Sequence, residues 1–128
     1  MNALEHLIDT YCDGWSAPTP EERERLIRAT LADDATYCDP RADDLPVPDL
    51  LAHISGVQAK RPGAKVVRTS AVDVHHGFAR FHWHVVLPDG TTLPEGLDVV
   101  ELSPDGKRIQ HVLGFFGPLQ RRSSSTSN

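Results

Sequence analysis

Cysteine, basic clusters and long apolar runs are all scarce in this chain of 128 residues, and each shortage excludes a class of protein. Its two cysteines, Cys12 and Cys38, stand too far apart for a Cys-x-x-Cys metal or redox pair and make no disulfide framework. No apolar run approaches the roughly 18 residues of a membrane-spanning helix, and the amino-terminal segment lacks the basic start of an export signal. We therefore expect a cytoplasmic protein with reduced thiols.

The charge balance argues against nucleic acid and anionic membranes as partners. The chain has 13 basic and 18 acidic residues, and its basic residues cluster only at Arg121 and Arg122. A Gly-rich phosphate loop, a nucleophile elbow and a cysteine–histidine pair are also missing, which excludes nucleotide and covalent-hydrolase chemistry. The composition is that of a folded protein with one core. We assign residues 1–120 to a single domain and residues 121–128 to a disordered polar tail.

The first half of the chain carries helical patterns. Apolar residues at three-and-four spacing predict an amphipathic helix over residues 3–15, with Tyr11 facing inward. Residues 19–22, Thr-Pro-Glu-Glu, combine a capping threonine with proline at the first helical position, which predicts the start of a second helix. A third helix is expected to begin near Pro48 and to stop before Pro62.

The second half carries strand patterns. Residues rich in valine, phenylalanine and threonine alternate between turn signals at Gly77 and at two Pro-Asp-Gly sequences. They predict four strands in an antiparallel meander, at residues 65–74, 78–87, 91–102 and 108–116. Three helices followed by a curved antiparallel sheet predict an α+β fold, a cone whose concave face is covered by the helices and holds a pocket.

Period-two alternation assigns the strand side chains to the two faces of the sheet. The inward set is Phe81, Trp83, Val112 and Phe116, and the outward set includes Arg80, His82, His84, His111 and Phe115. Histidines two residues apart on a strand can share a metal ion, but a sheet face that is half apolar and half histidine is more often a dimer contact. We expect a homodimer through this outer face and assign no metal.

Asp98 is an unusual residue because its strand is otherwise apolar. If it points inward, it lies near Phe81 and Trp83, where burial without a cationic partner raises the pKa of the carboxyl group. A neutral Asp98 can then donate a hydrogen bond at neutral pH. The alternative is an outward Asp98 that forms a surface ion pair with Arg80 or Arg108.

Asp39 also has two interpretations. It stands in the sequence ADDATYCDP, where Asp-Pro is a turn or strand-end signal and Asp33 and Asp34 fit a turn at the end of the second helix. However, Tyr37 and Asp39 share a face by alternation, and tyrosine prefers the half-buried side. Asp39 is therefore either a turn residue or a candidate base at the mouth of the pocket.

These residues carry a family resemblance. With Tyr11 on the first helix, Asp39 in ADDATYCDP and Asp98 in the strand that leads to GFFGP, the chain resembles the ketosteroid isomerases. More broadly it resembles the nuclear transport factor 2-like superfamily, which includes the SnoaL-like polyketide cyclases, over residues 3–118.

The resemblance implies a catalytic set and a reaction. Asp39 would be the general base that removes a proton next to a carbonyl group, and Tyr11 and neutral Asp98 would donate hydrogen bonds to the enolate oxygen. The reaction would be an isomerisation or a cyclisation that needs no cofactor. A small hydrophobic ligand would lie in a pocket lined by Trp15, Tyr37, Phe81, Trp83, Val112 and Phe116.

Two other functions fit the same fold. A non-catalytic domain would hold an apolar ligand in the cone or dimerise through the sheet. A neutral Asp98 near Tyr11 favours the enzyme, whereas an ionised, salt-bridged Asp98 favours the binding domain. Epoxide hydrolysis requires an inward Asp-Arg-Asp arrangement, and it ranks lowest because Arg80 is expected to face outward.

Overall fold

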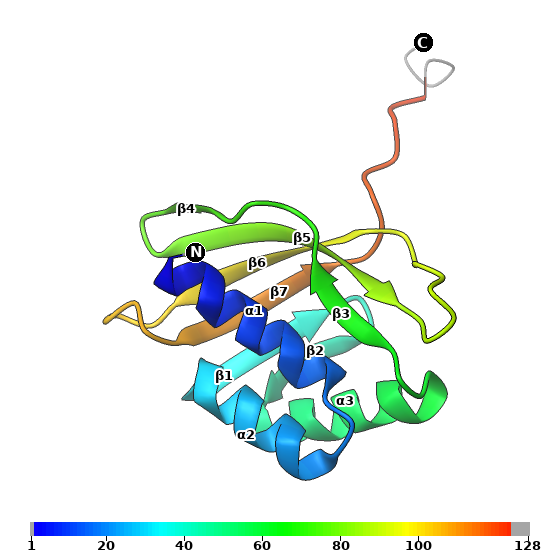
Figure 1. Cartoon of the computed structure of the whole chain (residues 1–128). Helices are drawn as coiled ribbons and strands as arrows, with labels where there is room; N and C mark the ends of the chain where they lie inside the picture. Colours follow the sequence, from blue (N-terminus) through cyan, green and yellow to red (C-terminus); the bar gives the residue numbers. More distant parts are fainter. Residues whose placement is uncertain (1, 124–128) are drawn as a thin grey trace.

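The computed structural model describes residues 2–123 and contains three helices and a mixed sheet of seven strands (Figure 1). The helices are α1 (Ala3–Ser16), α2 (Pro20–Thr30) and α3 (Val47–Lys60). The strands are β1 (Leu31–Asp39), β2 (Ala42–Pro46), β3 (Lys65–Arg68), β4 (Asp73–His75), β5 (Phe78–Val86), β6 (Gly96–Leu102) and β7 (Ile109–Phe115). The predicted α+β class is confirmed, with a curved sheet that does not close.

Capping side chains start the first two helices. The Asn2 side chain accepts a hydrogen bond from the Glu5 amide at 2.8 Å, and the Glu5 carboxylate accepts one from the Asn2 amide at 3.2 Å. At α2 the Thr19 hydroxyl accepts from the Glu22 amide at 3.2 Å, and Pro20 occupies the first helical position. The second helix therefore begins where the sequence predicts it.

The sheet is mixed rather than purely antiparallel. Its strand order is β2-β1-β7-β6-β5-β3, with β4 beside β5, and β1 runs parallel to β7. The expected turn at Asp33 and Asp34 is wrong, because both residues lie within β1 with their side chains exposed. Leu31 is buried at the start of β1, and the alternate residues Ala35 and Tyr37 are buried in its second half, where they pack on the core.

Two of the predicted strands are shorter than expected. The strand expected at residues 65–74 is divided into β3 and β4. The connection between them is attached to β5 by a hydrogen bond that the Ser70 hydroxyl accepts from the His82 amide at 2.8 Å. The strand expected at residues 91–102 begins only at Gly96. Pro94 precedes it and has no amide proton for a sheet ladder.

The three helices lie together on one side of the curved sheet (Figure 1). Between the two layers is a core of fully buried side chains that includes Ile8, Ile27, Leu50, Ile54, Phe81, Val100 and Val112. None of the helices within residues 2–123 is long and apolar enough to cross a bilayer. Residues 124–128 of the predicted tail lie outside the described residues.

The alternation of faces is confirmed over residues 78–82 of β5 and residues 112–115 of β7. It is lost over residues 83–86, which are all half-buried, and His111 is half-buried as well. Phe81 and Val112 are buried, whereas His82 and Phe115 are exposed on the outer face. Phe116, which was expected to point inward, is 46% exposed because β7 ends one residue before it. Dimerisation through the outer face stays a prediction.

Candidate active site

Asp39, Gly114 and Asp98 form a row across three adjacent strands. Asp98 on β6 pairs with Gly114 on β7, and Cys38 on β1 pairs with Leu113, so that Asp39 comes level with Gly114. A Cβ atom on Gly114 would lie 2.9 Å from Asp98 Oδ1 and 3.6 Å from Asp39 Cβ. Because glycine has no side chain, the two carboxyl groups approach each other over β7.

The Asp39 carboxylate is buried and held from three sides. Its side chain is 2% exposed, and Oδ2 accepts a hydrogen bond from the Tyr37 hydroxyl at 2.6 Å. Oδ1 accepts from the Arg41 amide at 2.7 Å, and His53 Nε2 lies 3.5 Å from Oδ2. Asp39 thus ends a strand, as its Asp-Pro context indicates, and also points inward, as the alternation indicates.

Tyr37 is a hydrogen-bond donor to this carboxylate at any moderate pH. Burial raises the pKa of Tyr37 far above its ordinary value, and interactions with Tyr11 and with Asp39 raise it further. The phenol therefore keeps its proton. Its contact with Asp39 fixes the orientation of the carboxylate in the way that a supporting donor orients a catalytic group.

His53 is the residue near Asp39 that the sequence analysis missed. It lies on α3, and its ring stands 6.0 Å from the Tyr37 ring and 5.9 Å from the Trp15 ring, centroid to centroid. Its side chain is 26% exposed, so it connects buried Asp39 with the solvent. The signal that would have found it is helical spacing, because His53 follows buried Leu50 by three positions on the inward side of α3.

Asp98 points inward, as one of the two sequence interpretations holds. It is 7% exposed, forms no ion pair among residues 2–123, and accepts a hydrogen bond on Oδ1 from Trp83 Nε1 at 2.8 Å. The alternative partner Arg80 pairs instead with Asp73, at 3.0 Å. Gly96 makes room for this contact, because a Cβ atom there would overlap the Trp83 indole.

The environment of Asp98 favours its neutral form. Burial raises the pKa of Asp98 to about 7, the hydrogen bond from Trp83 opposes the shift, and the charge of Asp39 adds to it. Near neutral pH the row therefore holds two carboxyl groups in unlike surroundings. Asp39 accepts two hydrogen bonds, from the Tyr37 hydroxyl and the Arg41 amide, whereas Asp98 accepts one, from Trp83.

The hydroxyl of Tyr11 is buried without a partner. Tyr11 is 2% exposed on α1, and within the described chain its Oη is the buried side-chain polar atom that makes no hydrogen bond. Burial raises the pKa of Tyr11 well above its usual value, and the charge of Asp98 adds to the rise. The Trp15 side chain opposes this rise in the pKa of Tyr11, but it forms no hydrogen bond with the Tyr11 hydroxyl. A donor is therefore left available beside the carboxyl row.

Replacing Tyr11 by phenylalanine is expected to leave stability unchanged or to raise it by about 1 kcal/mol, because a buried hydroxyl without a partner opposes folding. The matched control is Tyr37→Phe, which removes a hydroxyl that is bonded to Asp39. That control is expected to lose about 1–3 kcal/mol. Urea denaturation of both variants measures the difference, and equal losses in the two variants would contradict the unpartnered state of Tyr11.

Aromatic side chains fill the space over this row. Trp15 and Tyr37 stand 5.5 Å apart between centroids, and Trp83 meets the exposed ring of Phe116 edge-on at 6.1 Å. The Arg41 guanidinium lies 5.9 Å from the centre of the Phe116 ring.

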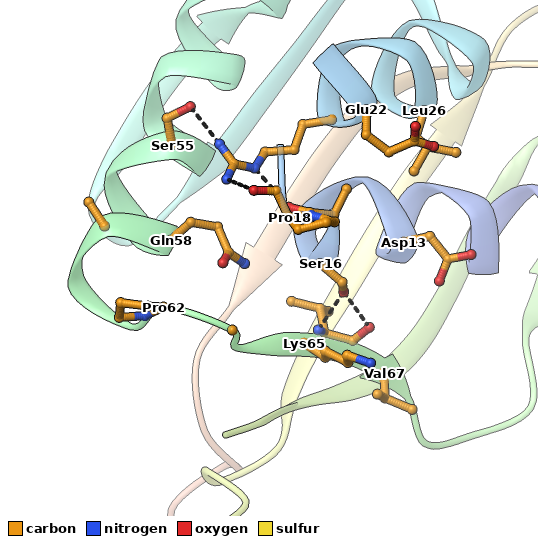
Figure 2. A pocket seen from close by; sticks show the side chains of 15 residues that line it. Asp13, Ser16, Pro18, Glu22, Leu26, Ser55, Gln58, Pro62, Lys65 and Val67 are labelled. Atoms are coloured by element: carbon orange, nitrogen blue, oxygen red, sulfur yellow. Dashed lines mark hydrogen bonds between the residues drawn. The ribbon is translucent and has the colours of Figure 1, made fainter. Parts of the chain in front are cut away.

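Of the residues expected to line a pocket, Phe81 and Val112 are part of the buried core. The hollow drawn in Figure 2 opens elsewhere, and its lining does not include the carboxyl row.

Within the described part of the chain, no three histidine, cysteine or carboxylate side chains are grouped so that they could hold a metal ion.

Comparison with known proteins assigns the family. No family model and no curated protein sequence matches the chain, but many solved structures do. A candidate isomerase of the SnoaL-like family from Agrobacterium tumefaciens is 30% identical, with a TM-score of 0.83 over 92% of this chain and 100% of that one.

More distant structures share the fold. A candidate ketosteroid isomerase from Kribbella flavida is 18% identical, with a TM-score of 0.65 over 94% of this chain and 82% of that one. A candidate polyketide cyclase from Sinorhizobium meliloti is 14% identical, with a TM-score of 0.66 over 89% of this chain and 99% of that one. The likeness to the Agrobacterium tumefaciens protein, at 30% identity over 100% of that chain, shows that this protein belongs to the SnoaL-like family.

Proposed function

We propose that the protein is a cofactor-independent enzyme that moves a proton on a hydrophobic carbonyl compound, as an isomerase or a cyclase. The observation that carries the proposal is the pair of buried carboxyl groups that approach each other over Gly114 in unlike surroundings. Asp39 is held as an acceptor by Tyr37 and by the Arg41 amide, whereas burial raises the pKa of Asp98 to about 7. Two such groups can take opposite roles, one as base and one as donor.

The reaction follows from these roles. Asp39 removes a proton from the carbon next to the carbonyl group. The electron pair of the broken C–H bond forms a carbon–carbon double bond, and the π pair of the carbonyl group moves onto its oxygen. Tyr11 and neutral Asp98 donate hydrogen bonds to that oxygen as its negative charge develops. Donors of this kind are worth about 3 kcal/mol each in a dry site. An isomerase then returns the proton from Asp39 to another carbon as the carbonyl group re-forms. In a cyclase the enolate carbon attacks a second carbonyl carbon, and the alkoxide formed there takes the proton from Asp39.

His53 has a supporting role in this scheme. Its Nε2 lies 3.5 Å from Asp39 Oδ2, and part of its ring is exposed to solvent. It is a third polar group beside the carboxylate, besides the Tyr37 hydroxyl and the Arg41 amide. It also orients the carboxylate together with Tyr37.

The substrate is inferred to be apolar from the side chains above the row. Phe116 is 46% exposed and packs edge-on against Trp83, and the Trp83 indole donates a hydrogen bond to Asp98, so an aromatic pair lies at the Asp98 end of the row. A planar hydrophobic molecule would pack against these rings. A polar molecule would gain little from a lining of aromatic rings.

Binding of a fluorescent naphthol, which mimics an enolate, tests the donors directly. The wild type is expected to bind the naphthol tightly at pH values below about 7 and more weakly at higher pH. The reason is that ionised Asp98 repels the naphthol oxygen and cannot donate a hydrogen bond to it. Asp98→Ala is expected to lose about 10-fold or more in affinity, as the removal of one such donor implies. Asp98→Asn, which keeps an N–H donor, is expected to bind and to lose the pH dependence.

The opposite result has a clear meaning. If the naphthol binds equally well to the wild type and to Asp98→Ala at every pH, the row is not an oxyanion site. The protein would then be a non-catalytic binding domain of the same fold.

A further inference from the structure

Arg23 is a buried cation without an anionic partner. It lies near the start of α2, is 8% exposed, and forms no ion pair within residues 2–123. Its Nε donates to the Ala17 carbonyl at 2.9 Å, Nη2 to the Pro18 carbonyl at 3.2 Å, and Nη1 to Ser55 Oγ at 3.2 Å. A guanidinium has five N–H donors, so two of them have no acceptor in the described chain.

The two carbonyl contacts give Arg23 a structural role, because they hold the connection between α1 and α2. They do not account for the remaining donors. A buried charge is costly unless it is paired, and uncharged acceptors compensate it only in part. Ser55 adds a further donor, since its oxygen accepts from Arg23 while its own hydroxyl proton has no acceptor among residues 2–123.

These donors line a hollow of about 770 Å³ between the end of α1, the start of α2, the end of α3 and β3 (Figure 2). Ligand sites for small organic molecules have volumes of about 300–1,000 Å³. The apolar part of the lining is Ala17, Leu26, Ala59, Pro62 and Val66. The hollow thus combines an apolar lining with a fixed guanidinium.

The other charged residues of the hollow favour a single negative charge on its occupant. Lys65 lines it and forms no ion pair among the described residues, whereas Glu22 is already paired with Arg25. Asp13 and Glu22 lie on the side of the hollow away from Ser55 and Gln58 (Figure 2). These two acids repel a monoanion at the opposite side of the hollow about half as strongly as they repel a dianion at the same position.

We propose that this hollow binds a small amphipathic carboxylate. Its two oxygens accept hydrogen bonds from the free N–H groups of Arg23 and from Ser55, in the planar geometry that arginine offers to carboxylates. Its apolar part lies against Leu26, Pro62 and Val66. The site is separate from the row at Asp39 and Asp98, so it does not depend on the proposed reaction.

The test is an NMR titration of the labelled protein with octanoate, and with octanamide as a neutral analogue of the same length. Octanoate is expected to shift the Arg23 Nε–H signal and the Ser55 and Val66 amides in a saturable manner. Octanamide is expected to bind about 10-fold or more weakly, a difference of about 1.4 kcal/mol.

Variants separate ligand binding from the structural role of Arg23. Ala59→Phe fills the hollow and keeps every hydrogen bond of Arg23, whereas Ala52→Phe places the same ring on an exposed part of α3 outside the hollow. Ala59→Phe is expected to abolish the octanoate shifts, and Ala52→Phe to preserve them at the same melting temperature. Asp39→Asn is expected to bind octanoate as the wild type does.

Arg23→Gln is expected to lose octanoate binding as well, with some loss of stability because the Ala17 and Pro18 carbonyls lose their donors. The proposal is overturned if octanoate and octanamide shift the same signals equally, or if octanoate binding survives Ala59→Phe. Absence of any saturable shift with octanoate would also overturn it, and Arg23 would then be a structural tie only.

Discussion

An Asp98→Asn variant is expected to be more stable than the wild type at about pH 8 and nearly equal to it at about pH 4. Burial raises the pKa of folded Asp98 to about 7 from an ordinary value of 3.8, so the folded protein binds one more proton than the unfolded chain between these values. In the wild type, the contribution of this proton to the free energy of unfolding is fully present below about pH 4 and is lost as the pH rises through about 7. About three pKa units correspond to an effect on the order of 4 kcal/mol.

Urea denaturation of both proteins at the two pH values measures this difference. The control is Asp73→Asn, because Asp73 is an exposed carboxylate on the surface that pairs with Arg80. Exposed pairs contribute about 0–1 kcal/mol, so this variant should follow the wild type at both pH values. If Asp98→Asn and the wild type changed in parallel with pH, Asp98 would have to be ionised throughout, and the donor assigned to the active site would be lost.

An Asp39→Asn variant is expected to lose about 10²–10⁴-fold in turnover, which is the usual contribution of a general base. Its ligand affinity should stay within a few-fold of the wild type. Asparagine has the shape of aspartate and its oxygen can still accept from the Arg41 amide, but an amide cannot take a proton from carbon. The Tyr37 hydroxyl, which donates to Asp39 Oδ2, can accept from the new amide group instead.

The measurement is the conversion of hydrophobic β,γ-unsaturated ketones to their conjugated isomers, followed by ultraviolet absorbance. Asp33→Asn is the matched control, because Asp33 lies on the same strand with its side chain exposed. It should leave turnover unchanged. Equal turnover in the wild type and Asp39→Asn would show that another group is the base, and binding of the ketones without conversion in the wild type would favour the binding domain.

Local patterns predicted the features that depend on near neighbours in the chain. The Thr19 cap and Pro20 mark the start of α2, and alternation along β5 places Phe81 in the core and His82 outside. Alternation left two orientations open for Asp98, and the structure decided for the inward one. The same rule failed at Phe116, because alternation holds only while the strand continues.

Pairing between strands that are far apart in the sequence decided what local patterns left open. Asp33 and Asp34 look like turn residues until β1 pairs with β7, a contact between opposite halves of the chain that no local preference specifies. That pairing brings Asp39 level with Gly114 and so toward Asp98.

By itself, then, the sequence determined the helix starts, the inward and outward faces of the strands and the residue types available for acid–base chemistry. Only the tertiary structure decided that His53 reaches Asp39, that Trp83 lies over Gly96 to reach Asp98, and that the Tyr11 hydroxyl has no partner. The physical reason is that hydrogen bonds and burial depend on side chains from several elements at once, whereas propensity and periodicity depend on a few consecutive residues.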